Sequence, residues 1–469
     1  MAKVSSGSQD NAPQQVPVRT VHVTSLGCPK NRVDSELMIG QLQAAGLQLV
    51  AAPEDADILL VNTCAFIDES KKESIDAILD LAEYKAAKPG TRLVVAGCLA
   101  QRHADELRKS LPEVDAFVGT GEYDHLPARL GLPGSDPDGL WQNALQLGRK
   151  GRPEYIADHL EPRYVGPNVY SSYLKIAEGC DQACSFCIIP KLRGKQRSRT
   201  VQDCVAEAEQ LVKAGVLELN LIAQDLTHYG VDIGQPDALS TLVRALGRVE
   251  GLRWVRLMYA YPHNFSDSLI AAMAETENCC KYLDMPLQHA ADPVLRAMKR
   301  LSNRREIETL LAKLRAAMPD LVLRTTMLVG HPGETAADFQ QLLEFVQEQQ
   351  FDRLGAFAFS REDGTLSGRM AGQLHSATKK SRLAQLMKLQ EGISTARLQA
   401  QVGRDLDVLI EGLSDETDLL LQGRSRGQAP EIDGLVYIND APDNVGRGQI
   451  RRVRITDSHT HDWVGHVID

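Results

Sequence analysis

The N-terminal part of the chain alternates short apolar runs with amphipathic stretches. Runs rich in β-branched residues span 19–28, 57–64 and 92–98, and a helical pattern follows each of them. A strand followed by a helix, repeated in this way, predicts a parallel α/β sheet. Each run ends in a cysteine, namely Cys28, Cys64 and Cys98. Because the carboxyl ends of parallel strands meet at one edge of a sheet, we expect these three thiols to converge there.

The middle of the chain shows the same alternation over a longer stretch. Six strand-like runs, separated by helical patterns, occur at 172–177, 216–223, 254–260, 282–287, 321–329 and 354–359. Six β-α units are fewer than the eight that close a full barrel. We therefore predict a partial (βα)6 TIM barrel, whose open mouth admits a large substrate.

From about residue 402 the pattern changes to short alternating runs divided by glycine and aspartate. This pattern predicts a small antiparallel β-barrel. The whole chain is thus expected to be an α/β protein with several domains. The predicted divisions are a disordered tail at 1–18, an N-terminal domain at 19–130, a linker rich in glycine and proline at 131–168, a central domain at 169–401 and a C-terminal barrel at 402–469.

Composition narrows the class of protein. With 469 residues, of which 43% are hydrophobic and 24% charged, the chain resembles ordinary soluble proteins of two or three domains. Nine cysteines, an odd number, fit a reducing compartment better than a disulfide framework, so we expect a cytoplasmic protein. The first eighteen residues lack the apolar core of a signal peptide, and no stretch is apolar for long enough to cross a bilayer, so no membrane partner is expected.

A second set of cysteines marks the candidate chemistry. Cys180, Cys184 and Cys187 lie in the run E-G-C-D-Q-A-C-S-F-C. Three thiolates this close in sequence hold only part of an iron–sulfur cluster, and an iron without a protein ligand is free to do chemistry. The alternatives for C-x-x-C are half a zinc site or a thioredoxin-like pair, but no second C-x-x-C or H-x-x-x-H follows to complete a zinc tetrahedron. For the upstream cysteines the alternative is a small buried side chain, yet three in equivalent positions favour a soft-metal site.

The C-x-x-x-C-x-x-C triplet resembles the signature of radical S-adenosylmethionine enzymes. The resemblance implies that Cys180, Cys184 and Cys187 are the catalytic ligands of a [4Fe-4S] cluster whose open iron binds S-adenosylmethionine. It further implies that an electron from the cluster cleaves this cofactor and releases a 5′-deoxyadenosyl radical, which removes hydrogen from unactivated carbon. The protein would then supply position and exclusion of water.

Together with that triplet, the upstream motifs resemble the methylthiotransferase family. The motifs are S-L-G-C-P-K-N at 25–31, V-N-T-C at 61–64 and V-A-G-C at 95–98, and the similarity runs from about residue 19 to the end, where 402–469 resembles a TRAM domain. The resemblance implies a second [4Fe-4S] cluster on Cys28, Cys64 and Cys98, which presents sulfur to the substrate carbon. It also implies two molecules of S-adenosylmethionine, one for the methyl group and one for the radical, and a low-potential electron donor such as a flavodoxin or ferredoxin.

Further contacts to the cofactor are implied on two strand ends. Gln224 and Asp225 fall where the family carries a Gly-Gly-Glu-like element, although both glycines are replaced here. Leu328, Gly330 and Glu334, in L-V-G-H-P-G-E, resemble the adenine-contacting turn. Polar residues at other strand ends include Tyr261, His263, Gln288 and His289. A basic run follows the cysteine triplet, with Lys191, Arg193, Lys195, Arg197 and Arg199 on alternate positions; it is either a solvated loop or a holder of carboxylates.

Charge favours one branch of the family. Residues 402–469 contain seven Arg, no Lys and thirteen Asp plus Glu, whereas an RNA-binding module should show a basic face, so direct RNA binding is not favoured. An acidic module attracts a basic protein. We therefore expect methylthiolation of the β-carbon of an aspartate in the twelfth small-subunit ribosomal protein, in the decoding region, rather than of an adenosine in tRNA. The rival classes are a non-enzymatic electron carrier with two clusters and a zinc-stabilised binding protein.

Overall fold

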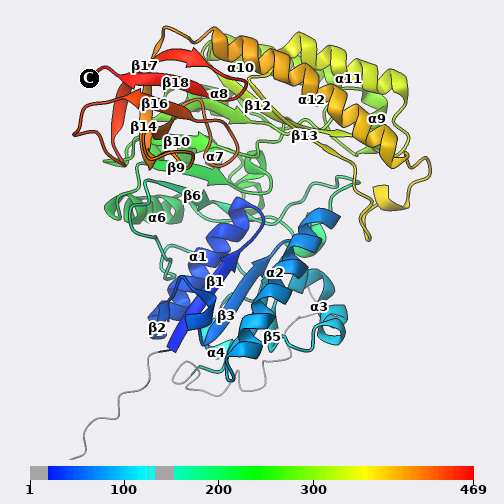
Figure 1. Ribbon diagram of the computed structural model, residues 1–469. Helices are drawn as coiled ribbons and strands as arrows, with labels where there is room; N and C mark the ends of the chain where they lie inside the picture. Colours follow the sequence, from blue (N-terminus) through cyan, green and yellow to red (C-terminus); the bar gives the residue numbers. More distant parts are fainter. Residues whose placement is uncertain (1–18, 125, 133–152) are drawn as a thin grey trace, which may run out of the picture.

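The computed structural model describes residues 19–124, 126–132 and 153–469. The expected tail at 1–18 and positions 133–152 of the expected linker lie outside the described residues. Linker residues 153–168 form neither helix nor strand. In Figure 1 the N-terminal sheet, in blue and cyan, lies below the green and yellow central domain, and the red C-terminal barrel lies beside the central domain at the top.

The N-terminal domain is a parallel sheet, as predicted. Its strands are, in spatial order, β2 (Leu47–Leu49), β1 (Arg19–Ser25), β3 (Ile58–Thr63), β4 (Arg92–Gly97) and β5 (Ala116–Val118). Its helices are α1 (Pro29–Ala44), α2 (Asp68–Ala87), α3 (Cys98–Ser110) and α4 (Leu126–Arg129). The sequence pattern missed β2 and β5, because three residues are too few to show alternation.

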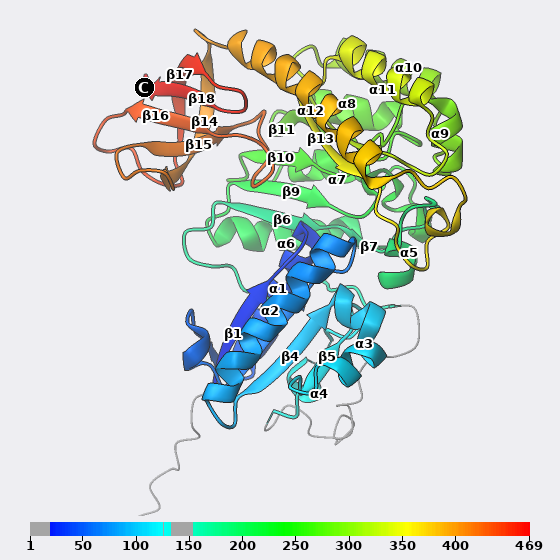
Figure 2. The ribbon, with the colours of Figure 1, turned by 45° about the vertical axis from the view of Figure 1, so that its right-hand side comes forward.

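Every residue of the central strand β3 is buried, because helices cover both faces of this sheet. On one face, Ile78 of α2 and Leu99 of α3 pack against Leu59. On the other, Met38 of α1 and Leu126 of α4 pack on the opposite side of the strands. Figure 2 shows α1 and α2 running along the sheet toward the central domain. The loops at the carboxyl ends of these strands are therefore held rigidly at the boundary between the two domains.

The central domain has the six parallel strands that the sequence predicts. In spatial order they are β13 (Arg353–Ala358), β12 (Val322–Val329), β11 (Cys279–Asp284), β10 (Trp254–Leu257), β9 (Glu218–Ile222) and β6 (Ser171–Lys175). Strand β11 begins three residues before the predicted 282, because Cys279 and Cys280 open it. A short ribbon of β7 (Ala177–Glu178) and β8 (Arg197–Ser198) follows β6.

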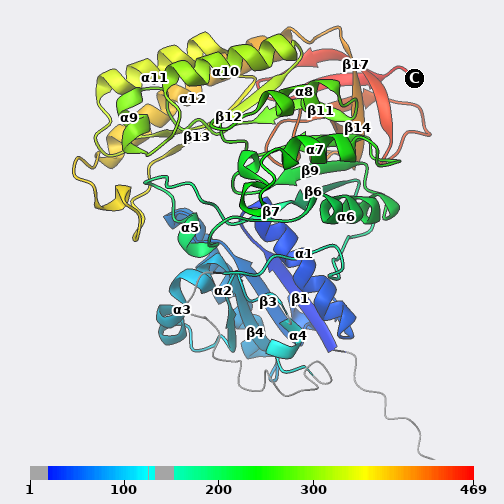
Figure 3. The ribbon, with the colours of Figure 1, turned by 180° about the vertical axis from the view of Figure 1, so that it is seen from behind.

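Helices cover the outer face of this sheet, as Figure 3 shows from behind. They are α6 (Val201–Lys213), α7 (Ala238–Leu246), α8 (Asp267–Glu275), α9 (Asp292–Ala297), α10 (Arg304–Ala317), α11 (Ala336–Gln349) and α12 (Ser376–Gln399). The short helix α5 (Ile189–Leu192) instead packs against the core of the N-terminal domain through Leu192. Among the described residues, four 3-10 turns lie at Pro53–Asp55, Leu226–His228, Val231–Ile233 and Ser367–Arg369. None of the helices in the described part of the chain is both long and apolar enough to span a bilayer.

Successive side chains of the central strands point to opposite faces, and the two faces differ in kind. Outward residues such as Leu219, Leu221 and Leu283 form the apolar core with the helices. Inward aromatic residues such as Trp254 and Tyr282 instead pack with residues of α1 and of the C-terminal barrel. The open mouth of the partial barrel is therefore partly filled by the two flanking domains.

The C-terminal domain is a closed five-stranded barrel. Its strands are, in spatial order, β14 (Asp405–Leu413), β15 (Leu421–Ser425), β16 (Val436–Asp440), β18 (Trp463–Val467) and β17 (Ile450–Ser458). The sequence predicts an antiparallel barrel, and four of its neighbour pairs are antiparallel. The pair of β16 and β18 is parallel, because the chain crosses from β16 to β17 before it returns through β18. Alternation along each strand cannot distinguish the two pairings.

A buried ion pair joins this barrel to the central sheet. Arg424 of β15 donates to Glu218 of β9 at 2.6 Å, and Arg256 of β10 donates to the same carboxylate at 2.8 Å. Burial alone would raise the pKa of Glu218, but Arg424 and Arg256 together lower it to about 2. The carboxylate is therefore charged at neutral pH and holds the two domains in one orientation.

Candidate active site

Cys180, Cys184 and Cys187 lie in the loop between β7 and α5. Backbone hydrogen bonds hold this loop: Cys180 N donates to Gly194 O at 3.1 Å and Ser185 N to Met298 O at 3.0 Å. Gly179 has φ +83, and an added Cβ would collide with the carbonyl of Lys195, so this position requires glycine. The loop is thus fixed before any ligand binds.

We call Cys28, Cys64 and Cys98 the first triad, and Cys180, Cys184 and Cys187 the second triad. Each thiol of the second triad accepts a hydrogen bond from an N–H group. Gln182 N lies 3.4 Å from Cys180 Sγ, and Ile189 N lies 3.5 Å from Cys187 Sγ. Arg300 Nη1 lies 3.7 Å from Cys184 Sγ. Burial raises the pKa of the Cys180 and Cys187 thiols to about 12, so without a metal they stay protonated. Such N–H donors stabilise thiolates that a cluster has deprotonated.

Cys28, Cys64 and Cys98 stand at three strand-to-helix turns, as the sequence predicts. Cys28 precedes α1 as its N-cap, Cys64 follows β3, and Cys98 is the first residue of α3. Ser74 fixes Cys64 by donating to its carbonyl at 2.9 Å and accepting from its N–H at 3.0 Å. Burial raises the pKa of the Cys98 thiol to about 12.

Both triads line one cavity of about 480 Å³ at the junction of the first two domains. The remaining cysteines, Cys204, Cys279 and Cys280, are buried in cores and are not among its lining residues. Much of the remaining wall is apolar or aromatic, and it includes Phe66, Ile67, Phe186, Leu192, Tyr259, Tyr261 and Phe357. A lining of this kind limits the access of water to a group held between the triads.

The donor set suits clusters better than a single ion. Among the described residues, no group of three His, Cys, Asp or Glu side chains is arranged to hold one metal ion. A mononuclear zinc site needs such a group, whereas the three thiolates of a cubane each bind a different iron. Two residues of the lining also carry a buried amide oxygen without a partner, because Gln224 Oε1 and Gln288 Oε1 accept no hydrogen bond from the described residues. The chemistry of the lining therefore fits two clusters and a polar cofactor.

Of the residues predicted to contact S-adenosylmethionine, only Gln224 lines the cavity. Its Nε2 donates to Glu178 at 2.5 Å. Asp225 lies behind the wall, where its carboxylate accepts from Gln182 Nε2 at 2.8 Å and from Thr227. Asp225 thus braces the same Gln182 whose N–H reaches Cys180.

The turn at 328–334 lies behind the wall, and its polar groups bond within the protein. Leu328 packs against Phe186 and Phe359, and Gly330 N donates to Glu334 at 2.6 Å. Glu334 also accepts from Arg382 at 2.5 Å. Burial raises the pKa of Glu334 despite Arg382. Direct cofactor contacts of Leu328, Gly330 and Glu334 stay predictions, and the geometry gives these residues a supporting position.

Sequence reasoning missed three cavity residues. Lys30 lies on α1, Arg300 follows α9, and Tyr259 follows β10. Tyr259 and Gln288 adopt positive φ values of +61° and +74°, conformations rare for such side chains and typical of functional sites. The Lys30 signal was present, since S-L-G-C-P-K-N contains it, but nothing local shows that its side chain turns toward the cavity.

The arginines of the basic run after the second triad, Arg193, Arg197 and Arg199, are wholly or partly buried, whereas Lys191 and Lys195 are exposed. Arg193 donates to Asp34 at 2.7 Å and Glu178 at 3.0 Å, and Arg199 donates to Asp203 at 2.5 Å. Arg197 donates to backbone carbonyls, and Lys191 donates to Gly364 O. The run therefore does hold carboxylates, but they belong to the protein itself.

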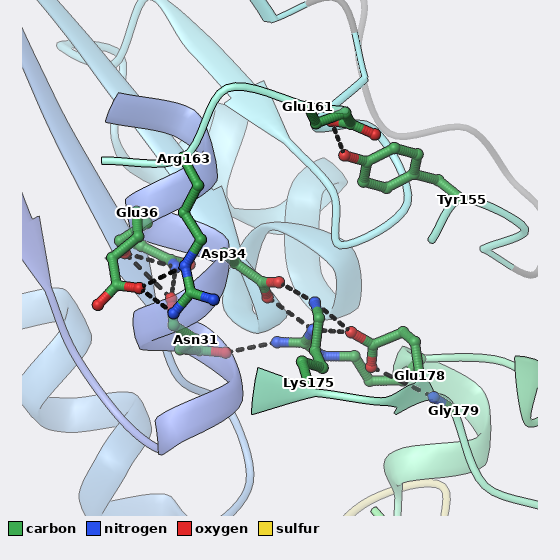
Figure 4. A network of polar contacts seen from close by, with 12 residues as sticks. Asn31, Asp34, Glu36, Tyr155, Glu161, Arg163, Lys175, Glu178 and Gly179 are labelled. Atoms are coloured by element: carbon green, nitrogen blue, oxygen red, sulfur yellow. Dashed lines mark hydrogen bonds and ion pairs between the residues drawn. The ribbon is translucent and has the colours of Figure 1, made fainter. Parts of the chain in front are cut away.

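Figure 4 shows the buried network of Asp34, Lys175 and Glu178 between α1 and the central domain. Arg193 belongs to this network because it donates to both carboxylates. Lys175 donates to Asp34 at 2.5 Å and to Glu178 at 2.9 Å. Arg193 reaches Cys98 Sγ at 3.6 Å as well. Burial opposes ionisation of Glu178, but Arg193 and Lys175 hold its pKa far below the usual range. The two negative charges of Asp34 and Glu178 balance the two positive charges of Lys175 and Arg193. Through Arg193, the network connects Cys98 of the first triad to the segment that leads into the second triad.

The glycine before Cys98 is a critical part of this geometry. Gly97 has φ +96 and ψ −155, a region that is almost exclusive to glycine, and an added Cβ would contact Asn62 and lie 2.6 Å from Thr63 O. We expect Gly97→Ala to lower the free energy of unfolding by about 3 kcal/mol and to reduce iron uptake. Denaturant unfolding and iron analysis check this result.

Gly46→Ala is the matched control for this substitution. Gly46 has φ +90 but nothing within 4 Å of an added Cβ, so only backbone strain of about 1 kcal/mol is expected. Equal losses at Gly46 and Gly97 would contradict a role for the tight contact beside Cys98.

The comparisons with known proteins agree with this architecture. Three family models match in order: Uncharacterized protein family UPF0004 at residues 20–119, the Radical SAM superfamily at 174–346 and the TRAM domain at 402–468. A cobalamin-binding radical S-adenosylmethionine methyltransferase, TsrM from Kitasatospora setae, shares the fold with a TM-score of 0.56 at 15% identity, covering 75% of this chain and 77% of that one. The architecture is thus that of a radical S-adenosylmethionine enzyme with two flanking domains.

Full-length relatives define the particular family. Proteins named ribosomal protein uS12 methylthiotransferase RimO are 49% identical in Anaeromyxobacter sp. (strain K), covering 96% of this chain and 93% of that one, and 47% identical in Geobacter sulfurreducens, covering 96% and 98%. In Pelobacter propionicus the identity is 48%, covering 95% and 97%. The chain belongs to this RimO family.

Proposed function

We propose that this protein adds a methylthio group to the β-carbon of an aspartate in ribosomal protein uS12. The observation that supports this most is that both cysteine triads line one largely apolar cavity, in a chain whose full-length relatives are named for that reaction. Cys180, Cys184 and Cys187 would hold one [4Fe-4S] cluster, and Cys28, Cys64 and Cys98 would hold a second. When bound, the clusters and S-adenosylmethionine would supply the hydrogen-abstracting radical, the sulfur and the methyl group.

The protein's own residues position these groups. The sulfurs of the second triad accept hydrogen bonds from Gln182, Ile189 and Arg300. These bonds would reduce the electron density that the thiolates donate to a bound iron. Gln224 lines the cavity, and its buried amide oxygen, which has no partner among the described residues, would accept from an ammonium group such as that of S-adenosylmethionine once the side chain turned toward it. Aromatic walls keep water from a reactive radical. A low-potential flavodoxin or ferredoxin would deliver electrons, and we place the reaction in the cytoplasm.

The C-terminal barrel supports a protein substrate over RNA. Three arginines of β17 that could contact phosphates each pair with an aspartate: Arg451 with Asp469 at 3.1 Å, Arg452 with Asp407 at 3.0 Å and Arg454 with Asp405 at 2.7 Å. A basic stripe is what an RNA-binding barrel needs, and pairing removes it from this strand. Ribosomal proteins are mostly basic, so the acidic excess of 402–469 favours their approach.

The test offers both substrates to the same enzyme. Anaerobically reconstituted protein is incubated with S-adenosylmethionine, a low-potential reductant, and either uS12 or total tRNA, and products are analysed by mass spectrometry. We expect a methylthio group on one aspartate of uS12 and none on tRNA, and loss of the product with Cys184→Ala. A methylthiolated adenosine without modified uS12 would contradict the proposal and favour the tRNA branch.

A further inference from the structure

Lys30 places an ammonium group in the wall of the reaction cavity. It is the second residue of α1, two positions after Cys28, and only 6% of the residue is exposed. Its Nζ lies 2.9 Å from the centroid of the Tyr259 ring. Among the described residues, no carboxylate forms an ion pair or hydrogen bond with this ammonium group. A buried lysine with only an aromatic face as its partner is uncommon.

The neighbouring buried charges do not need Lys30. In the network of Figure 4, Asp34 and Glu178 are balanced by Lys175 and Arg193. The carboxylate of Asp284, on β11, already accepts from Arg324 Nη1 at 2.7 Å and from Tyr259 N at 3.1 Å. Lys30 therefore forms no direct ion pair with these carboxylates, and Cys28, Asp284 and Glu178 act on its charge only through space.

An unpaired charge inside a largely apolar cavity costs free energy, and the face of a tyrosine ring offsets only part of that cost. An anion that enters the cavity would complete the pairing. Two other cations line the wall. Arg193 is already paired with Asp34 and Glu178, and Arg300 lies at the opposite triad, where it contacts Cys184 Sγ at 3.7 Å and the Tyr261 ring at 3.8 Å. Lys30 instead lies beside Cys28 of the first triad, on the side from which sulfur is presented under the proposed function.

We propose that Lys30 binds the side-chain carboxylate of the substrate aspartate. The inference rests on the proposed function, in which the β-carbon of that aspartate receives sulfur. This carbon is one bond away from the carboxylate carbon, so an ion pair at Lys30 holds it between the two triads. Fixing a reacting atom in this way saves much of the entropy of the reaction step.

The same contact sets specificity. A site built around a charged partner rejects an analogue that lacks the charge far more strongly than an apolar pocket rejects a small change in size. Asparagine has the shape of aspartate without its charge, and an adenosine base has no carboxylate. Lys30 is thus a specificity-determining residue.

The experiment measures binding of uS12 carrying either aspartate or asparagine at the modified position, once mass spectrometry has identified that position. The protein is the full chain with reconstituted clusters and S-adenosylmethionine, and dissociation constants are measured anaerobically. Wild-type protein is expected to prefer aspartate by about tenfold or more. Lys30→Met, which keeps the apolar stem, is expected to bring the ratio close to one, and Lys30→Arg to keep most of it.

Lys72→Met is the matched control, because it makes the same chemical change at a side chain that is 80% exposed on α2. It is expected to leave the ratio unchanged. A Lys30→Met protein that discriminates as well as wild type overturns the role of Lys30. Wild-type protein alone also tests the proposal. If it binds uS12 with aspartate and uS12 with asparagine equally well, the role of Lys30 is overturned.

The outcomes separate this inference from the proposed function. Wild-type protein that modifies uS12 while Lys30→Met keeps full discrimination overturns only the role of Lys30. Wild-type protein that neither binds nor modifies uS12 overturns both.

Discussion

Replacing Cys28, Cys64 and Cys98 together with alanine is expected to halve the iron that reconstituted protein binds, from about eight to about four per chain. The reason is that the two triads occupy separate turns around one cavity, so each can hold its own cluster. The methylthio product on uS12 should be absent, because no sulfur-donating site is left. Iron analysis and mass spectrometry measure both effects.

The reciprocal variant and a control sharpen this test. Replacing Cys180, Cys184 and Cys187 with alanine should also halve the iron, and it should abolish formation of 5′-deoxyadenosine. Cys204→Ala alters a cysteine buried in the core of the central domain, with its Sγ 3.8 Å from the Tyr229 hydroxyl, and should leave the iron content at the wild-type value. If the first triple variant keeps its full iron content, the assignment of a second cluster fails.

Asp34→Asn is expected to lower the free energy of unfolding by about 3–5 kcal/mol, because it leaves a net positive charge in the buried network. Asp34 accepts from Lys175 and Arg193, and all three side chains are almost fully buried. The variant removes one carboxylate and leaves two bases facing Glu178 alone. Denaturant unfolding of the first cooperative transition measures the change.

Two further variants test the physical reason. Asp76→Asn removes a carboxylate from the exposed pair with Lys72, which has an N–O distance of 3.2 Å, and should cost less than about 0.5 kcal/mol. Asp34→Asn combined with Lys175→Met restores a neutral network and should recover part of the loss. If the double variant loses more free energy of unfolding than the two single variants lose together, the shape of these side chains, and not their charge, dominates this site.

Much of the fold follows from local pattern. β-branched runs that end at Cys28, Cys64 and Cys98 predict the three long strands of the N-terminal sheet, and six further runs predict the central strands. These predictions are confirmed, because a parallel strand that is buried on both faces leaves a continuous apolar run in the sequence. The short strands β2 and β5, the early start of β11 and the parallel pair in the C-terminal barrel escaped prediction. Each depends on a few residues or on a pairing that alternation does not encode.

Some residues of the candidate site could also be predicted from local sequence, and others could not. The six cysteines stand out by spacing alone, and their ligation of clusters stays a prediction that the geometry favours. The pairing of Arg193 and Arg199 with internal carboxylates could not be predicted, since Asp34 lies 159 residues before Arg193. The same holds for Lys30, whose partner ring at Tyr259 comes from another domain.

By itself, the sequence determined the longer strands of the two parallel sheets and which nine thiols are available, because these depend on residues close together in the chain. Only the tertiary structure decided that the two triads share one cavity, that the arginines of the basic run pair inside the protein, and that the buried Lys30 has no carboxylate partner among the described residues. Those features arise when segments far apart in sequence pack together and desolvate their charges, and the free energy of each pair then depends on which partner is within reach.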